Sequence, residues 1–179
     1  ADICGISEQE LYACFGEPIR ELAAAGGMTY EQTCVKLREQ YDGYHFRENA
    51  VGMYNPYSLL NTFDSLSFND YWFRTGTPTF LVRLLQKNDY LLEDLKGLYV
   101  DVTTLQGVDE EYADPIPVLF QSGYLTISGY SPELGYRLDF PNLEVERGFF
   151  NFLMPYYTSV LKSSVQSYLN RLTAALRQG

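Results

Sequence analysis

The sequence is poor in the side chains that bind metal ions or form disulfides. It has one histidine, His45, and three cysteines, Cys4, Cys14 and Cys34, with no CxxC spacing. These residues exclude a zinc site of mixed histidine and cysteine ligands. The odd cysteine count argues against a disulfide framework, so we expect all three to be small buried side chains of a reducing cytoplasm.

Familiar catalytic and phosphate-binding motifs are also missing. The sequence contains no GxxxxGK[ST], GxGxxG, HExxH, GxSxG or EF-hand pattern. Such motifs supply backbone amides for phosphates, metal ligands or an activated nucleophile. We therefore predict no catalytic, cofactor-binding or metal-binding residue in this chain.

Positive charge is scarce: 13 lysines and arginines face 23 aspartates and glutamates, for a formal net charge of −10. Nucleic acids and anionic membrane surfaces both attract proteins through clustered cations, so both partners are disfavoured. No apolar run is long enough to cross a bilayer. We expect a cytoplasmic protein that does not bind membranes.

What the chain does have is the composition of a folded protein, with 46% hydrophobic and 16% aromatic residues. Its 179 residues suffice for one large domain or two small ones. It begins with Ala-Asp-Ile rather than an initiator methionine. Together with the missing chemistry, this start leads us to expect a piece of a longer protein.

Helix signals dominate the first part. Capping residues, or a proline at the first helical position, mark the expected helix starts at Ser7, Thr29, Asn55-Pro56 and Thr77-Pro78. The first helix should be split near Gly16 and should end at Gly26-Gly27. The helix after Thr29 should reach Tyr41, and the helix after Asn55 should end near Ser65.

The most distinctive segments are residues 41–46, with the sequence YDGYHF, and residues 54–60, with the sequence YNPYSLL. Asp42-Gly43 predicts a turn, so we expect a β-hairpin near residues 43–54. Aromatic crowding favours a packing role for the hairpin. The alternative is proton transfer by Asp42, Tyr44 and His45, although neighbouring strand residues point to opposite faces.

From about residue 97 the pattern changes to short strands and helices. The expected elements are a strand over 99–102, a helix from Asp114-Pro115 toward Phe120, strands over 123–127 and 136–140, and a helix after Pro141-Asn142. We therefore predict a mainly α protein with short β-hairpins, an α+β fold. A helical lid-like domain should span residues 1–97, and a winged-helix-like domain residues 98–179.

Two weaker sites can be considered. Asp94-Leu95-Lys96 matches half of a metal nuclease motif but lacks the strand context, so a solvated charged face is the better interpretation. The acidic run Asp109-Glu110-Glu111 with Asp114 could bind a cation, but it is better explained as a solvated loop before a helix start.

Charge also bears on the winged-helix-like part. From Gly107 to Phe150, eight acidic residues face only Arg137 and Arg147. A wing that reads DNA should be basic. We therefore interpret this part as a module that packs against protein.

Six motifs in this order resemble the later part of a bacterial family of AAA-ATPase-like proteins that end in a PD-(D/E)xK nuclease-like domain. They lie at residues 41–46, 54–60, 71–72, 75–78, 122–127 and 141–145. Each motif alone is weak, but six in order, within residues 3–157, are fairly specific.

The resemblance implies an ATPase core upstream, which would bind ATP and Mg²⁺, and a nuclease-like domain downstream. Both would be partners within the same parent chain, and this segment would be the helical lid and winged-helix-like portion between them. Structural roles are implied for Tyr41, Asp42, Gly43, Tyr44, Phe46, Tyr54, Asn55, Pro56, Gly123, Tyr124, Pro141 and Asn142.

Three functional hypotheses follow. The favoured one is a non-catalytic regulatory or interaction segment of such an ATPase, and the second is a nucleic-acid-binding winged helix. A free-standing enzyme built on Asp42 and His45 is the third. Arg47, Arg74 or Arg83 could sense a phosphate, but a surface salt bridge is the commoner role of such residues.

Overall fold

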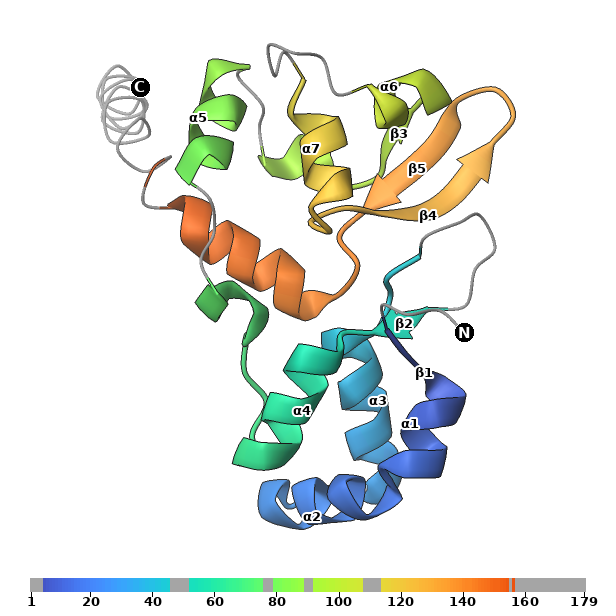
Figure 1. The fold of residues 1–179 in the computed structure, drawn as a ribbon, viewed down its shortest axis with the longest axis vertical. Helices are drawn as coiled ribbons and strands as arrows, with labels where there is room; N and C mark the ends of the chain where they lie inside the picture. The colour runs from blue at the N-terminus through green and yellow to red at the C-terminus, as the bar shows by residue number, and fades with distance from the viewer. Residues whose placement is uncertain are drawn as a thin grey trace, which may run out of the picture.

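A computed structural model describes residues 5–45, 52–75, 79–88, 92–107, 114–154 and 156. The chain has a mainly α-helical α+β fold with two small antiparallel sheets, as predicted (Figure 1). Several residues considered above lie outside the described ranges: Cys4, Phe46, Arg47, residues 76–78 and the acidic run 109–111.

The first part is built from α1 (Glu8–Cys14), α2 (Gly16–Gly26), α3 (Tyr30–Tyr41) and α4 (Pro56–Ser65). Ser7 and Thr29 form the predicted capping interactions, and the Asn55 side chain accepts the amides of Tyr57 and Ser58. The predicted split near Gly16 is confirmed. The predicted stop is confirmed by Gly27, which ends α2 in the left-handed conformation at φ 63°.

Of the hairpin expected near residues 43–54, residues 46–51 lie outside the described ranges. Tyr41 ends α3, as predicted, and Tyr44 and Met53 exchange the two backbone hydrogen bonds of one isolated bridge. Strand β2 (Met53–Tyr54) pairs instead with β1 (Ile6–Ser7), an antiparallel partner that the sequence did not reveal. Two-residue strands have no alternation to recognise.

The second part contains α5 (Thr79–Lys87), η1 (Trp72–Thr75) and η2 (Leu92–Leu95) as 3-10 turns, β3 (Leu98–Val100), α6 (Val102–Gln106), α7 (Pro115–Gln121), β4 (Thr126–Ser131), β5 (Gly135–Asp139) and a helix over residues 143–154. The antiparallel sheet has the order β3-β5-β4. Leu138 of β5 lies between Leu98 and Ile127, so the three side chains share the buried face.

Three expectations for this part and for the cysteines were wrong. Val102 does not continue a strand, because the Asp101 side chain accepts the Thr104 amide and starts α6. Residues 123–125 form a turn after α7, and β4 begins only at Thr126, since Gly123 takes φ 78° at the helix end. Cys14 is exposed, whereas Cys34 is buried as expected.

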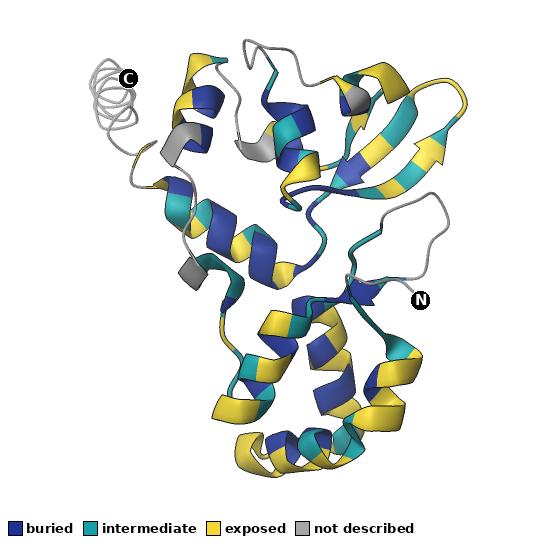
Figure 2. Cartoon of the chain, viewed as in Figure 1, coloured by how far each residue is buried: buried dark blue, intermediate teal, exposed yellow. Residues whose placement is uncertain are grey.

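Buried apolar side chains form two clusters. Figure 2 marks the buried residues along the ribbon in dark blue. The helical cluster extends from Leu11 to Tyr71 and comes from α1 to α4 with β2. The sheet cluster extends from Leu81 to Leu153 and includes α5, η2, α7, the sheet and the 143–154 helix. The residue-97 boundary thus falls within the segments of the sheet cluster, and the division into domains stays a prediction.

Candidate functional site

Residues from five of the six motifs come together between the two clusters. We call this contact region the junction; it consists of Gly43, Tyr44, His45, Ser58, residues 70–73, Gly123, Tyr124, Thr126, Pro141, Glu144, Arg147 and Gly148. Its hydrogen bonds His45–Thr126, Ser58–Glu144 and Trp72–Glu144 join residues 72 to 86 positions apart, so the contact depends on the tertiary fold. The junction is the place where the helical part contacts the sheet part.

Gly43 brings the backbones of two motifs into contact. A Cβ atom built at Gly43 would lie 1.9 Å from the carbonyl oxygen of Pro141, and Gly43 has φ 108°. Glycine is therefore needed here both for space and for backbone conformation. The Asp42-Gly43 turn, for which we predict a structural role, thus contacts Pro141 of another motif.

The adjacent residues add polar and apolar contacts across the same boundary. The His45 amide donates to Thr126 Oγ1 at 2.8 Å, and that hydroxyl donates to the His45 carbonyl oxygen at 3.1 Å. The Tyr44 ring packs against the sheet cluster and lies near Gly123. One short segment of the helical part thus reaches the start of β4.

Glu144 is the polar centre of the junction. Its side chain is fully buried, and its two carboxylate oxygens accept the Ser58 hydroxyl at 2.9 and 2.7 Å. One of these oxygens also accepts the Trp72 amide at 2.9 Å. Burial raises the pKa of Glu144, while the hydrogen bonds from Trp72 and Ser58 act in the opposite direction.

Residues 70–73 connect the two clusters and lie along the 143–154 helix. Tyr71 belongs to the helical cluster, whereas Trp72 and Phe73 pack against the sheet cluster. The Phe73 ring occupies the space beside Gly148, where a Cβ atom would lie 2.1 Å from a ring carbon. The neighbouring side chains of Tyr71 and Trp72 therefore pack into different cores. Glu144 of the 143–154 helix accepts the Trp72 backbone amide between them.

A second set of hydrogen-bonded polar side chains lies at the edge of the junction. Arg147 Nη2 donates to Gln40 Oε1 at 2.6 Å and to Asp70 Oδ1 at 3.2 Å. The Gln40 amide nitrogen also donates to Asp70 at 3.0 Å. Residues of α3, of the connecting segment and of the 143–154 helix are thus linked in one network.

Aromatic rings fill the sheet side of the junction. The Trp72 and Tyr124 ring centroids are 4.9 Å apart in an edge-to-face arrangement with an interplanar angle of 66°, and the tilted rings of Tyr124 and Phe149 are 5.3 Å apart. Edge-to-face pairs of this kind add about 0.5–1.5 kcal/mol beyond area burial. The Trp72 indole is therefore a direct reporter of the junction.

The proton-transfer alternative receives no support from the geometry of Asp42, Tyr44 and His45. No hydrogen bond joins any two of these three described side chains. Burial raises the pKa of Asp42 and that of Tyr44, which leaves the Tyr44 phenol a poor proton donor.

Among the described residues, five buried side-chain atoms lack a hydrogen-bond partner, and all five lie in the motif segments. They are Asp42 Oδ1, Tyr44 OH, His45 Nδ1, Tyr54 OH and Asn142 Nδ2. Asn142 nevertheless caps the 143–154 helix, since its Oδ1 accepts the Val145 amide at 3.0 Å. Asn55 and Pro56 likewise act as a helix start.

The other candidates do not assemble into a site. Asp94 is exposed, and Lys96 pairs with Glu146 at 2.5 Å, which fits the interpretation as a solvated charged face. Arg83 is exposed, and Arg74 has no described side chain. Among the described residues, no group of three or more His, Cys, Asp or Glu side chains is placed to hold a metal ion.

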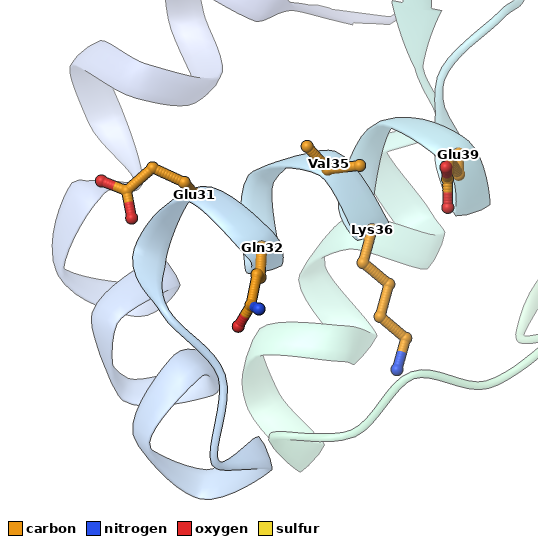
Figure 3. A pocket seen from close by; sticks show the side chains of 5 residues that line it. All are labelled: Glu31, Gln32, Val35, Lys36 and Glu39. Atoms are coloured by element: carbon orange, nitrogen blue, oxygen red, sulfur yellow. The ribbon is translucent and has the colours of Figure 1, made fainter.

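A surface pocket lies on α3 (Figure 3), and none of its lining residues belongs to the junction. Its lining residues are Glu31, Gln32, Val35, Lys36 and Glu39, all from one face of this helix. The Lys36 Nζ atom lies 4.4 Å from the centre of the Phe68 ring. The carboxylates of Glu31 and Glu39 and the Lys36 ammonium group, which lies over Phe68, share one helix face and do not form a catalytic arrangement.

Sequence reasoning did not single out Ser58, Asp70, Thr126, Glu144, Arg147 or Gly148 as site residues. Ser58, Thr126 and Glu144 lie inside motif segments, and this position is the signal by which they could have been identified as site residues. Glu144 also sits beside the apolar stripe formed by Val145 and Phe149, where a charged residue is unusual. The hydrogen-bond partners of these residues are 30 to 107 positions away in sequence, which no local pattern reveals.

Comparison with known proteins gives one relevant relative. The chain is 33% identical over 174 residues to an uncharacterized protein encoded in the 5' region of vnfD in Azotobacter chroococcum mcd 1. The match covers 93% of this chain and 31% of that protein, so the chain spans about a third of the length of its relative. No family model and no solved structure matches. No helix within the described ranges is long and apolar enough to cross a membrane.

Proposed function

We propose that the chain is a non-catalytic regulatory or interaction segment of a bacterial, cytoplasmic AAA-type ATPase. In this role it couples the nucleotide state of an ATPase core to a nuclease-like domain further along the parent chain. The observation that carries the proposal is the convergence of distant motif segments on one buried junction. A connector of two packed clusters transmits movement only if such a contact holds them together.

The lengths of the related chains support a role within a larger protein. The matched relative is about three times as long as the segment it shares with this chain. ATP and Mg²⁺ would bind to the ATPase core, not to this segment, and the partners would be the core and the nuclease-like domain. A GxxxxGK[ST] motif upstream and a GxD…ExK pattern downstream in the gene would support this architecture; their absence would contradict it.

The second part has features in favour of a winged-helix-like module. Its elements follow the order α5, β3, α6, α7, β4, β5, and the sheet order is β3-β5-β4. A winged helix-turn-helix has the same succession of helices and strands, in which α7 would correspond to the recognition helix.

The alternative function, nucleic acid binding through this module, meets two obstacles. Helix α7 has the sequence PIPVLFQ, without lysine or arginine, and most of it is buried: Pro115, Ile116, Pro117 and Leu119. In the hairpin that follows, Arg137 pairs with Asp139 at 3.2 Å, so this cation is already neutralised. A helix of this kind has no cation for phosphate and few free side chains for base edges.

Two assays on the isolated chain separate these hypotheses. We expect no ATP hydrolysis above a buffer blank, and measurable turnover would overturn the non-catalytic assignment. We also expect no anisotropy change with labelled duplex DNA up to about 100 µM, the weak end of ordinary non-specific binding. Binding tighter than about 1 µM that weakens with salt would establish the alternative.

Coupling is tested in the longer parent protein. ATP should alter the protease sensitivity of the nuclease-like domain when the junction is intact. Gly43→Ala should reduce this response, because it forces the turn away from Pro141. The matched control is Gly16→Ala, where the added Cβ has no neighbour within 4 Å. An unchanged response in both variants would contradict coupling through the junction.

A further inference from the structure

Glu144 is an unusual residue at the centre of a structural contact. The carboxylate is fully buried, and among the described residues no lysine, arginine or histidine forms a salt bridge with it. Buried carboxylates without a cation carry a large desolvation cost that hydrogen bonds offset only in part. A glutamine would fit the same space, accept the Trp72 amide and hydrogen-bond to Ser58 without that cost.

The charged groups that face Glu144 do not remove this cost. Asp70, from the connecting segment, adds negative charge and further raises the pKa of Glu144. Arg147, on the same helix, is engaged by Asp70 and Gln40. Tyr41 of α3 and Tyr44 also face the carboxylate, and its charge contributes to raising the pKa of both phenols, so they stay neutral. From α4 the group that reaches Glu144 is the Ser58 hydroxyl.

We propose that the junction is a two-state switch, in which the buried Glu144 carboxylate destabilises the closed contact and drives it to open as a unit. Opening would separate Trp72 and Ser58 from Glu144 and would hydrate the carboxylate. Because His45 and Thr126 bridge the same boundary, their hydrogen bonds would break in the same event. The buried residues of the helical and sheet clusters would remain folded on either side, while the partly buried Trp72 ring would leave its contact with Tyr124.

Proton binding gives the direction of the switch. In the open state Glu144 ionises with the ordinary pKa of a glutamate, whereas in the closed state burial raises that pKa. Opening therefore releases a proton, and rising pH favours the open state between the two pKa values. Each unit of difference between them is worth about a tenfold change in the opening equilibrium.

This inference concerns the segment itself and does not depend on an ATPase parent. Loss of the proposed function would leave the switch intact, since the switch is measured in the isolated chain. Failure of the switch would leave a rigid connector. The two proposals therefore fail separately.

Amide hydrogen exchange by NMR tests the switch, because the Trp72 and His45 amides both donate across the junction. In the wild type, the protection factors of both amides should fall together as pH rises from 5 to 8. In Glu144→Gln both should be about tenfold or more higher than in the wild type at pH 8 and should not vary with pH. Glu133→Gln, which removes an exposed charge from the β4–β5 turn, should behave as the wild type.

Several results would overturn the proposal. Lower protection in Glu144→Gln than in the wild type, or a variant that fails to fold, would mean that the charge stabilises the junction. A change in the protection of the Trp72 amide without a change at His45 would mean that the junction does not open as a unit.

Trp72 fluorescence provides a second measurement, since Trp72 is the single tryptophan of the chain. Its emission should shift with pH in the wild type and stay constant in Glu144→Gln.

Discussion

At Gly43 the backbone passes so close to the Pro141 carbonyl oxygen that no side chain fits between them. Residues such as this one and Glu144 determine how the two clusters meet, although neither belongs to a hydrophobic core. Their side chains, or the lack of one, act through contacts with residues far away in sequence. The predictions at this scale therefore concern stability and pH rather than catalysis.

Gly43→Ala should lower the free energy of unfolding by about 2 kcal/mol or more, since it adds a steric conflict to an unfavourable positive φ. Urea unfolding followed by circular dichroism measures the change. Gly16→Ala, at the start of α2 and with free space around it, should stay within about 1 kcal/mol of the wild type. Equal effects of the two substitutions would refute the contact.

Buried tyrosines should make the fold sensitive to alkali. Burial raises the pKa of Tyr41 to about 12, and it raises those of Tyr44 and Tyr54 as well. The unfolded chain ionises these phenols near pH 10. Because the folded chain keeps the protons, its stability is complete below pH 10 and falls as pH rises toward 12.

This loss of stability is measured by urea unfolding at several pH values between 9 and 12, together with the phenolate absorbance at 295 nm. A late group of tyrosines should ionise in the same pH range in which the fold is lost. Ionisation of all tyrosines near pH 10 by a chain that stays folded would contradict the assigned burial.

At the scale of elements, helices with local start signals were predicted well. Ser7, Thr29 and Asn55 carry their signal in neighbouring residues, because an N-cap contacts amides two or three positions ahead. The same signal was present at Asp101, but the alternation of Tyr99 and its neighbours was read as a strand.

Other elements had no local signal that could have been used. Strand β1 exists only because Ile6 lies beside Tyr54, 48 positions away. The candidate site was predicted in part: the motif segments that form it were identified as structural. Glu144 was not predicted as its polar centre, since burial of a charge depends on Ser58 and the connecting segment reaching it.

The contact between residues 70–73 and the 143–154 helix gives a prediction at the same scale. Gly148→Ala should displace the Phe73 ring, shift the emission of the adjacent Trp72 and cost about 1–3 kcal/mol of unfolding free energy. Gly129→Ala in β4 is the control, because its Cβ would meet only Arg137 Cβ at an ordinary 3.8 Å. An unshifted Trp72 emission in Gly148→Ala would show that the ring does not pack as described.

For the whole molecule, the two clusters are the units and the junction is their connection. Neither the net charge of −10 nor the helix content distinguishes a rigid connector from two independent domains. The contacts made by Gly43 and Glu144 do, because each one joins the helical part to the sheet part. While the junction is closed, a chain connected in this way should unfold as one cooperative unit.

Hydrogen exchange with mass spectrometry across a urea series at pH 6 tests this central claim most directly. Peptides from α3 in the helical cluster and from α7 in the sheet cluster should become exchangeable at the same urea concentration. In Gly43→Ala the two transitions should move apart, because the steric contact that joins the clusters is disrupted. If the two peptides of the wild-type chain already unfold at different urea concentrations, the junction does not couple the clusters and the account is contradicted.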